Sequence, residues 1–269
     1  MELGIGSYTF SWAVGTPSYP APVNPLSAMG LLEKCREYNV SLVQICCNMP
    51  LDLMSEKQIN GIRQKADEYK IVIEIGNRNV KPENLLVYLK IADRLNAKIL
   101  RTMLFTEEGS PPVKQAAAWI RQVIPAFIDS GVSIAVENHD KHTSDELIEL
   151  VDRVDSPHIG ICLDTANCYG ALESTDQALQ KLSPYTINLH IKDYDIIRVS
   201  HAMGFLITGR PAGEGRLDIK RIVGKVRENG KKANVILEQW APFLDDIEET
   251  VINEEEWARR GVFYLKSIM

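Results

Sequence analysis

The sequence lacks the segments that would anchor a protein in a membrane or direct it to secretion. No stretch of its 269 residues approaches the ~18 consecutive apolar residues that span a bilayer. The N-terminal segment MELGIGSYTF has neither the basic part nor the long apolar part of a signal peptide. A low-complexity tract is absent as well. We therefore expect a globular, cytoplasmic protein without a membrane partner.

Basic charge and cysteine are also scarce. The 30 Lys and Arg residues are outnumbered by 36 Asp and Glu, which gives a formal net charge of −6. This balance argues against a nucleic-acid partner, because binding a polyanion requires a basic surface. The five cysteines are odd in number and do not have zinc-finger spacing. We therefore expect reduced thiols rather than disulfides.

What the chain does contain is a regular alternation of short apolar runs and helical segments. The runs predict strands that begin near eight positions: Leu3, Leu42, Ile71, Lys98, Val132, Ile159, Thr186 and Asn234. Between and after them, apolar residues at spacings of three and four predict helices over Ala28–Tyr38, Glu56–Tyr69, Pro82–Leu95, Val113–Ser130, Ser144–Val154, Asp176–Leu182, Ile219–Glu228 and Ile247–Leu265. Eight strand–helix units predict a (β/α)8 TIM barrel of the α/β class, as a single domain over residues 1–269.

Two long connections depart from this regularity. Residues 10–25 follow the first strand and residues 194–217 follow the seventh. Both leave from carboxyl ends of strands, the face of a parallel barrel where active sites form. We expect them to be loops that act as lids or pocket walls.

Four strands end in polar residues that metals favour. Glu137, Asp164, His190 and Glu238 close the runs SIAVE, GICLD, INLH and VILE. In each run the polar residue falls on the face opposite its bulky apolar neighbours, because side chains alternate along a strand. Burying three carboxylates together is unfavourable without a cation, so the sequence predicts one divalent metal ion. Oxygen-rich ligation with one imidazole favours Mn²⁺, Mg²⁺ or Co²⁺, with Zn²⁺ as an alternative.

Five motifs then carry a resemblance to the xylose isomerase-like TIM-barrel superfamily, the group of sugar phosphate isomerases and epimerases and of type 2 AP endonucleases. They are VENHD (136–140), LDTANCYG (163–170), LHIKD (189–193), GEGRLD (213–218) and ILEQW (236–240). The resemblance implies the same four metal ligands, with Glu137 and Glu238 also acting as the acid–base pair. It further implies a small sugar or polyol substrate and a homo-dimer or homo-tetramer.

Other residues are candidates for contact with the substrate. They are Tyr8 at the end of the first strand, Trp12, His139, Asn167 and Arg210. Asn167 stands where many members of the superfamily carry histidine, which weakens the match to the ketose 3-epimerases. Tyr8 has core packing as an alternative role, Trp12 has packing within a lid, and His139 has a place in a surface loop.

Four further residues are expected to support the site. Gln44 and Glu74 are predicted to face inward and to lie behind the ligands. Arg101 is expected to neutralise the acidic cavity. Lys192 shares the face of His190, although a solvated position is an equal alternative.

These features predict a metal-dependent sugar isomerase or epimerase, which transfers a proton through a metal-stabilised cis-enediolate. The alternative is a dehydratase, a lyase that acts on an inosose-type or 3-keto polyol substrate on the same scaffold. A non-catalytic sugar-binding protein is the third reading, and the intact ligand set argues against it.

Overall fold

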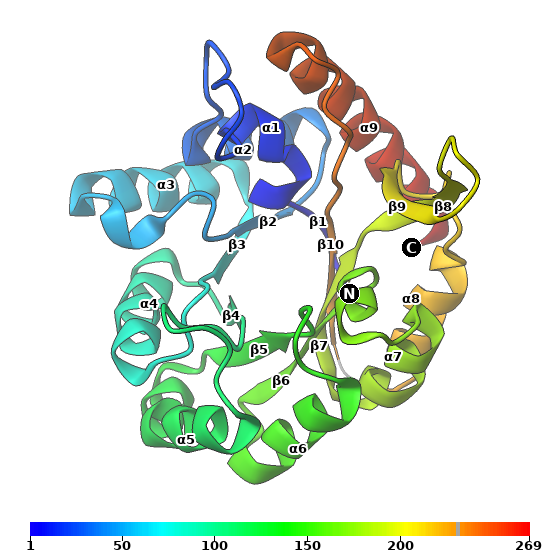
Figure 1. Cartoon of the computed structure of the whole chain (residues 1–269). Coiled ribbons are helices and arrows are strands. Elements are labelled where there is room, and N and C mark those ends of the chain that lie inside the picture. The colour runs from blue at the N-terminus through cyan, green and yellow to red at the C-terminus, as the bar shows by residue number, and fades with distance from the viewer. Residues whose placement is uncertain (230–231) are drawn as a thin grey trace.

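Eight parallel strands close into a barrel at the centre of the molecule (Figure 1) within residues 1–229 and 232–269, which a computed structural model describes. The strands are β1 (Leu3–Gly6), β2 (Leu42–Ile45), β3 (Val72–Gly76), β4 (Ile99–Thr102), β5 (Ser133–Glu137), β6 (Ile159–Asp164), β7 (Thr186–Ile191) and β10 (Asn234–Leu237). Their order around the barrel is β1-β10-β7-β6-β5-β4-β3-β2. The predicted barrel is therefore confirmed.

Helices surround the barrel on the outside (Figure 1). They are α2 (Ala28–Glu37), α3 (Glu56–Tyr69), α4 (Pro82–Leu95), α5 (Val113–Ser130), α6 (Ser144–Val154), α7 (Thr175–Leu182), α8 (Ile219–Glu228) and α9 (Ile247–Ile268). Short 3₁₀ turns lie at Ser7–Phe10, Leu51–Leu53, Asn167–Ala171 and Ser183–Tyr185. Several helices begin where capping residues stand: Ser55 and Thr143 each accept a hydrogen bond from the backbone of the third helical residue.

Alternation along the strands separates an apolar layer from a polar interior. Ile134 and Val136 of β5 are fully buried in the core between barrel and helices. Inside the barrel lies a polar layer, in which Glu74 accepts hydrogen bonds from Gln44, Asn188 and Asn234. These donors come from three different strands, so the layer ties the strands together beneath their carboxyl ends.

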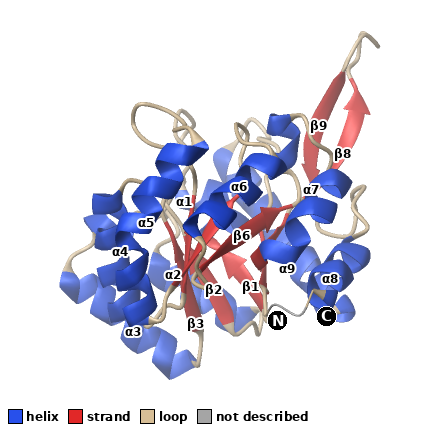
Figure 2. Cartoon of the chain, turned by 90° about the horizontal axis from the view of Figure 1, so that it is seen from below, coloured by secondary structure: helices blue, strands red, loops and turns tan. Residues whose placement is uncertain are grey.

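The connection after β7 differs from the expected loop. It forms an antiparallel hairpin of β8 (Asp193–Arg198) and β9 (Phe205–Arg210), which extends away from the barrel in Figure 2. At its base, a Cβ on Gly209 would lie 2.3 Å from the carbonyl oxygen of Trp240. Only glycine allows this approach, and it places the base of the hairpin against the chain that follows β10.

The connection after β1 forms the short helix α1 (Ser11–Val14), which a buried carboxylate holds in place. The backbone N–H groups of Trp12 and Ala13 donate to the two oxygens of Glu254 in α9, each at 2.9 Å. The indole of Trp12 donates to the carbonyl of Ala241 at 2.8 Å. The segment that was expected to be a lid or a pocket wall is therefore held in place at α1, by α9 and by the chain that follows β10.

Two further expectations bear on the chain as a whole. The five cysteines, Cys35, Cys46, Cys47, Cys162 and Cys168, are all free thiols, as expected. Across the described ranges, no helix has both the length and the apolar character needed to cross a bilayer.

The buried Glu254 is expected to make the free energy of unfolding depend on pH. Burial raises its pKa to about 8, although the backbone donors of Trp12 and Ala13 lower it. An unfolded glutamate has a pKa of about 4.3, so between these values the unfolded chain ionises while the folded chain resists. Glu254 should therefore reduce the free energy of unfolding as pH rises from about 5 to about 8. Urea unfolding at both pH values should show a smaller loss for Glu254→Gln than for the wild type.

A control variant separates this effect from other titrations. Glu256 lies two residues along α9 and pairs with Arg259 on the surface. Glu256→Gln should lose stability with pH as the wild type does. An identical loss in Glu254→Gln would contradict the assignment.

Candidate metal centre

The four polar strand ends converge at one end of the barrel. His190 Nδ1 lies 3.2 Å from Glu238 Oε1, 3.5 Å from Glu137 Oε2 and 4.0 Å from Asp164 Oδ2. All four residues are buried, with exposed fractions of 2% or less. Strand register places Asp164 directly beside His190. The structure thus gathers the four predicted ligands around His190 Nδ1.

Hydrogen bonding fixes the tautomer of His190. Its Nε2 lies 2.8 Å from the side-chain oxygen of Gln44, and that oxygen can only accept a hydrogen bond. In the neutral imidazole, the form that binds a metal, Nε2 therefore carries the proton and Nδ1 presents its lone pair to the site. Gln44 is held in turn, because its amide nitrogen donates to Glu74 at 3.1 Å and to Asn188 at 3.0 Å. Such outer hydrogen bonds orient metal-binding histidines in proteins.

Three atoms that can bind an ion point into the centre, and one of them, Asp164 Oδ2, is also paired with Lys192. One oxygen of Asp164 accepts from the backbone N–H groups of Ala166 and Asn167, and its second oxygen, Oδ2, points into the site. Within the described ranges, His190 Nδ1 and Glu238 Oε1 have no hydrogen-bond partner. Asp164, His190 and Glu238 offer ligand atoms that lie within 4.8 Å of one another. Buried acceptors without partners are unfavourable, and a divalent cation would satisfy them.

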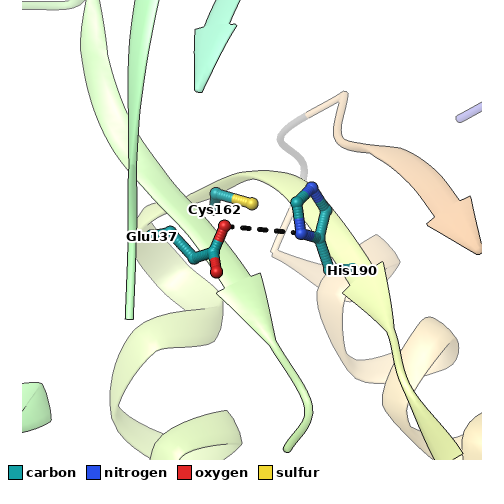
Figure 3. Close-up of side chains that lie close together, drawn as sticks. All are labelled: Glu137, Cys162 and His190. Carbon is teal, nitrogen blue, oxygen red and sulfur yellow. Dashed lines mark ion pairs between the residues drawn. The ribbon is translucent and has the colours of Figure 1, made fainter. Parts of the chain in front are cut away.

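A second cluster combines Glu137, Cys162 and His190 (Figure 3). Burial raises the pKa of the Cys162 thiol well above its usual range, and the thiol donates to Asn188. A protonated thiol is a poor ligand, because metals bind the thiolate. The donor set therefore favours the group formed by Asp164, His190 and Glu238.

Two buried cations correct the argument that only a metal could offset three carboxylates. Arg101 donates to Glu137, and Lys192 Nζ lies 2.7 Å from Asp164 Oδ2 and 3.0 Å from Glu238 Oε2. Burial would raise the pKa of Glu137, but Arg101, with His190 and Lys192, lowers it to about 2. The carboxylates raise the pKa of Lys192, although burial opposes this. The free acceptor atoms, rather than charge alone, are thus the evidence for a metal site.

Glu137 stands apart from the other three predicted ligands. Its Oε2 is paired with Arg101, and its Oε1 accepts a hydrogen bond from Asn167 Nδ2 at 2.7 Å. Both oxygens therefore already have partners. The side chain of Glu137 therefore lines the site, and neither of its oxygens is free to bind a metal.

The mouth of the barrel holds two adjoining pockets. The first has a volume of about 200 Å³ and is lined by Tyr8, Cys47, Arg78, Arg101, Met103, Glu137, His139, Asn167, Lys192 and Glu238. The second has a volume of about 300 Å³ and is lined by Tyr8, Ser11, Ala166, Asn167, Tyr169, Lys192, Ile207, Gln239 and Trp240. They share three residues, so one substrate can contact both.

A larger hollow of about 600 Å³ lies among residues of α7 and α8 on the outside of the barrel, away from the ligands.

The predicted substrate residues divide into two groups. Tyr8, His139 and Asn167 line the first pocket, where Tyr8 is hydrogen bonded to Cys47 and His139 pairs with Asp140. Trp12 and Arg210 are not among the residues that line either pocket at the mouth. Trp12 is buried beside Phe243 and Tyr19, and Arg210 lies 3.5 Å from Asp195 within the hairpin.

Sequence reasoning missed Arg78 and gave too little weight to Lys192. Arg78 lies two residues beyond β3, in the segment GNRN, and lines the first pocket. Its place directly after a strand is the signal that could have drawn attention to it. Lys192 lies two residues beyond His190, on the same face, and its side chain is only 16% exposed.

Comparison with known proteins shows the family to which this fold belongs. The model of the Xylose isomerase-like TIM barrel family matches residues 3–268. The chain belongs to this family. It is 32% identical over 265 residues to 3-oxo-isoapionate decarboxylase of Pectobacterium atrosepticum, covering 98% of this chain and 95% of that protein.

Solved structures show the same architecture. A D-psicose 3-epimerase crystallised with D-fructose is 15% identical, with a TM-score of 0.75 over 100% of this chain and 99% of that one. A Xylose isomerase-like TIM barrel protein from Mycobacterium smegmatis, solved in complex with magnesium, is 17% identical, with a TM-score of 0.68 over 97% and 96% of the chains. In this chain, the buried cluster of Asp164, His190 and Glu238 offers the donor atoms of a candidate divalent metal site.

Gln44 provides a test of the metal centre that does not require a substrate. Gln44→Met removes the acceptor that fixes His190, so the affinity for Mn²⁺ should fall roughly 10–100-fold. Calorimetric titration of the metal-free protein would measure this change. Gln239→Met is a matched control, because Gln239 is equally buried but donates to backbone carbonyls of Thr9 and Glu254. Equal affinities in the two variants would contradict the role of Gln44.

Proposed function

We propose that the chain is a divalent-metal-dependent lyase that decarboxylates a 3-oxo sugar acid. The observation that carries this proposal is the likeness to 3-oxo-isoapionate decarboxylase, at 32% identity over nearly the full length of both chains. Membership of the family and the metal-binding geometry make a small, sugar-type substrate the natural ligand of the site. The proposal shares enolate chemistry with the isomerase reading but assigns a different product.

The residues of the site suit this reaction. Asp164, His190 and Glu238 would hold the cation, which when bound supplies Lewis acidity toward a substrate carbonyl. Lys192 lines both pockets, so its ammonium group would lie beside the negative charge that develops on the substrate. Tyr8 and Asn167, which also line both pockets, would orient the hydroxyl groups.

The reaction balances without a further reactant. The bond between the carboxylate carbon and its neighbouring carbon breaks, and its electron pair moves toward the 3-oxo group. Carbon dioxide leaves, and one proton from solvent or from an acidic group of the site is added to the carbon that lost it. No base has to remove a proton from carbon.

That last requirement separates the proposal from the isomerase or epimerase reading. Epimerisation would need Glu137 and Glu238 to remove and return a proton on opposite faces of the substrate. Glu137 is engaged by Arg101 and by Asn167, which leaves neither oxygen free. Glu238 keeps a free oxygen, but one carboxylate cannot serve both faces. The engagement of Glu137 therefore favours the lyase.

Product analysis tests the proposal. The protein loaded with Mn²⁺ or Mg²⁺ should release carbon dioxide from 3-oxo-isoapionate or from other 3-oxo aldonic acids. Removal of the metal with EDTA should abolish the release, and added Mn²⁺ should restore it. Interconversion of neutral ketoses without carbon dioxide would support the isomerase reading instead, and loss of water would support the dehydratase.

Lys192 yields a second prediction. Lys192→Met should lower kcat for decarboxylation by about 10²–10³-fold, the usual effect of removing one group that stabilises developing charge. Binding of Mn²⁺ should persist, because the three ligands remain. Lys181→Met is a matched control, since Lys181 also pairs with two carboxylates, Asp145 and Glu173, but outside the barrel. A Lys192→Met variant with unchanged kcat would contradict the role of the ammonium group.

A further inference from the structure

The first pocket at the mouth contains three cationic side chains, and two of them already have anionic partners. Arg101 is paired with Glu137 and also donates to the carbonyl of Asn77. Lys192 lies against Asp164 and Glu238. These two groups mainly balance the carboxylates of the protein itself.

The third cation, Arg78, has no such partner. Within residues 1–229 and 232–269, no ion pair or hydrogen bond joins its side chain to another residue. Asp140 lines an adjoining hollow with Arg78, but that carboxylate is paired with His139. A guanidinium that has no anionic partner and lies at the edge of a substrate pocket is available to bind an anion from solution.

Packing orients Arg78 in this position. Its guanidinium carbon lies 4.0 Å from the centre of the Phe105 ring, within the range of a cation–π contact. The two residues come from the segments that follow β3 and β4, at the carboxyl end of the barrel. Stacking restricts the side chain, so less conformational entropy is lost when it binds a ligand.

We propose that Arg78 binds a carboxylate of the substrate and makes the site selective for sugar acids over neutral sugars. The assignment rests on the proposed function and names the substrate class of the same site. A planar guanidinium matches a carboxylate through two parallel hydrogen bonds. Arg78 and Lys192 line the same pocket of about 200 Å³, which is smaller than the ~300–1,000 Å³ of pockets for drug-sized ligands. A short sugar acid can therefore reach from Arg78 to the metal ligands.

Binding measurements test this role without any turnover. D-Xylonate and xylitol differ in having a carboxylate or a hydroxymethyl group at one end, and neither is a 3-oxo acid that could lose carbon dioxide. In titration calorimetry with Mn²⁺ present, the wild type should bind xylonate more tightly than xylitol. Arg78→Gln should weaken xylonate binding by about tenfold or more, since hydrogen bonds to charged groups are worth that much. Its binding of xylitol and of Mn²⁺ should not change.

Arg198 supplies a matched control. Its guanidinium carbon lies 4.4 Å from the centre of the Phe205 ring, but on the projecting hairpin and not among the residues lining the pockets at the mouth. Arg198→Gln should keep the wild-type preference for xylonate. Arg78→Lys should retain part of it, because lysine keeps the charge but not the paired geometry.

Two outcomes would overturn the assignment, and a third would overturn only the proposed function. One is equal weakening of xylonate and xylitol in Arg78→Gln, which would indicate a packing role. Another is tighter, Arg78-dependent binding of D-xylulose 5-phosphate than of xylonate, which would assign the anion as a phosphate. If xylonate binding depends on Arg78 but no 3-oxo acid loses carbon dioxide, the carboxylate site stands and the decarboxylase proposal fails.

Discussion

The hydrogen bond between His190 and Gln44 is the interaction on which the candidate site depends. In the neutral imidazole it fixes the proton on Nε2 and so leaves the lone pair of Nδ1 facing the site. The bond joins residues 146 positions apart in the sequence, which closure of the barrel brings together. Beneath it, Glu74 and Asn188 hold Gln44 in place. The polar interior of the barrel thus serves as a rigid support for the imidazole, which limits the reorganisation needed when an ion binds.

The charged side chains above this polar interior form two separate sets of ion pairs. Arg101 is paired with Glu137, and this pair lies toward β4 and β5. Lys192 is shared by Asp164 and Glu238, beside the atoms that would bind the metal. A divalent ion at that position would take over the charge that Lys192 now balances, and the ammonium group would then be free to turn toward a substrate. The same four strand ends can therefore serve a lyase even though the superfamily also contains epimerases.

Much of this arrangement follows from the sequence. Strand alternation placed Glu137, Asp164, His190 and Glu238 on one face, and the repeated strand–helix pattern required that face to line a barrel. Helix ends were predictable where caps such as Ser55 and Thr143 stand. These are local patterns, and local patterns determine most elements of a regular barrel.

Other features depend on distances that no local pattern contains. The connection that contains β8 and β9 was expected to be a loop, whereas its two strands pair with each other across residues 199–204. Burial of Lys192 against two carboxylates requires the strands to be in register. Trp12 was expected near the substrate, but Glu254, which lies 242 residues away, holds its backbone in a buried position. Within the described ranges Arg78 stacks on Phe105 but has no ion-pair or hydrogen-bond partner, which only the folded chain can reveal.

The central claim is that one divalent cation binds to Asp164, His190 and Glu238. Anomalous X-ray diffraction from crystals grown with Mn²⁺ tests it most directly. A single peak is expected about 2.0–2.2 Å from Asp164 Oδ2, His190 Nδ1 and Glu238 Oε1, with the ammonium of Lys192 displaced from between the carboxylates. A site without a peak, with Lys192 still bridging Asp164 and Glu238, would contradict the account.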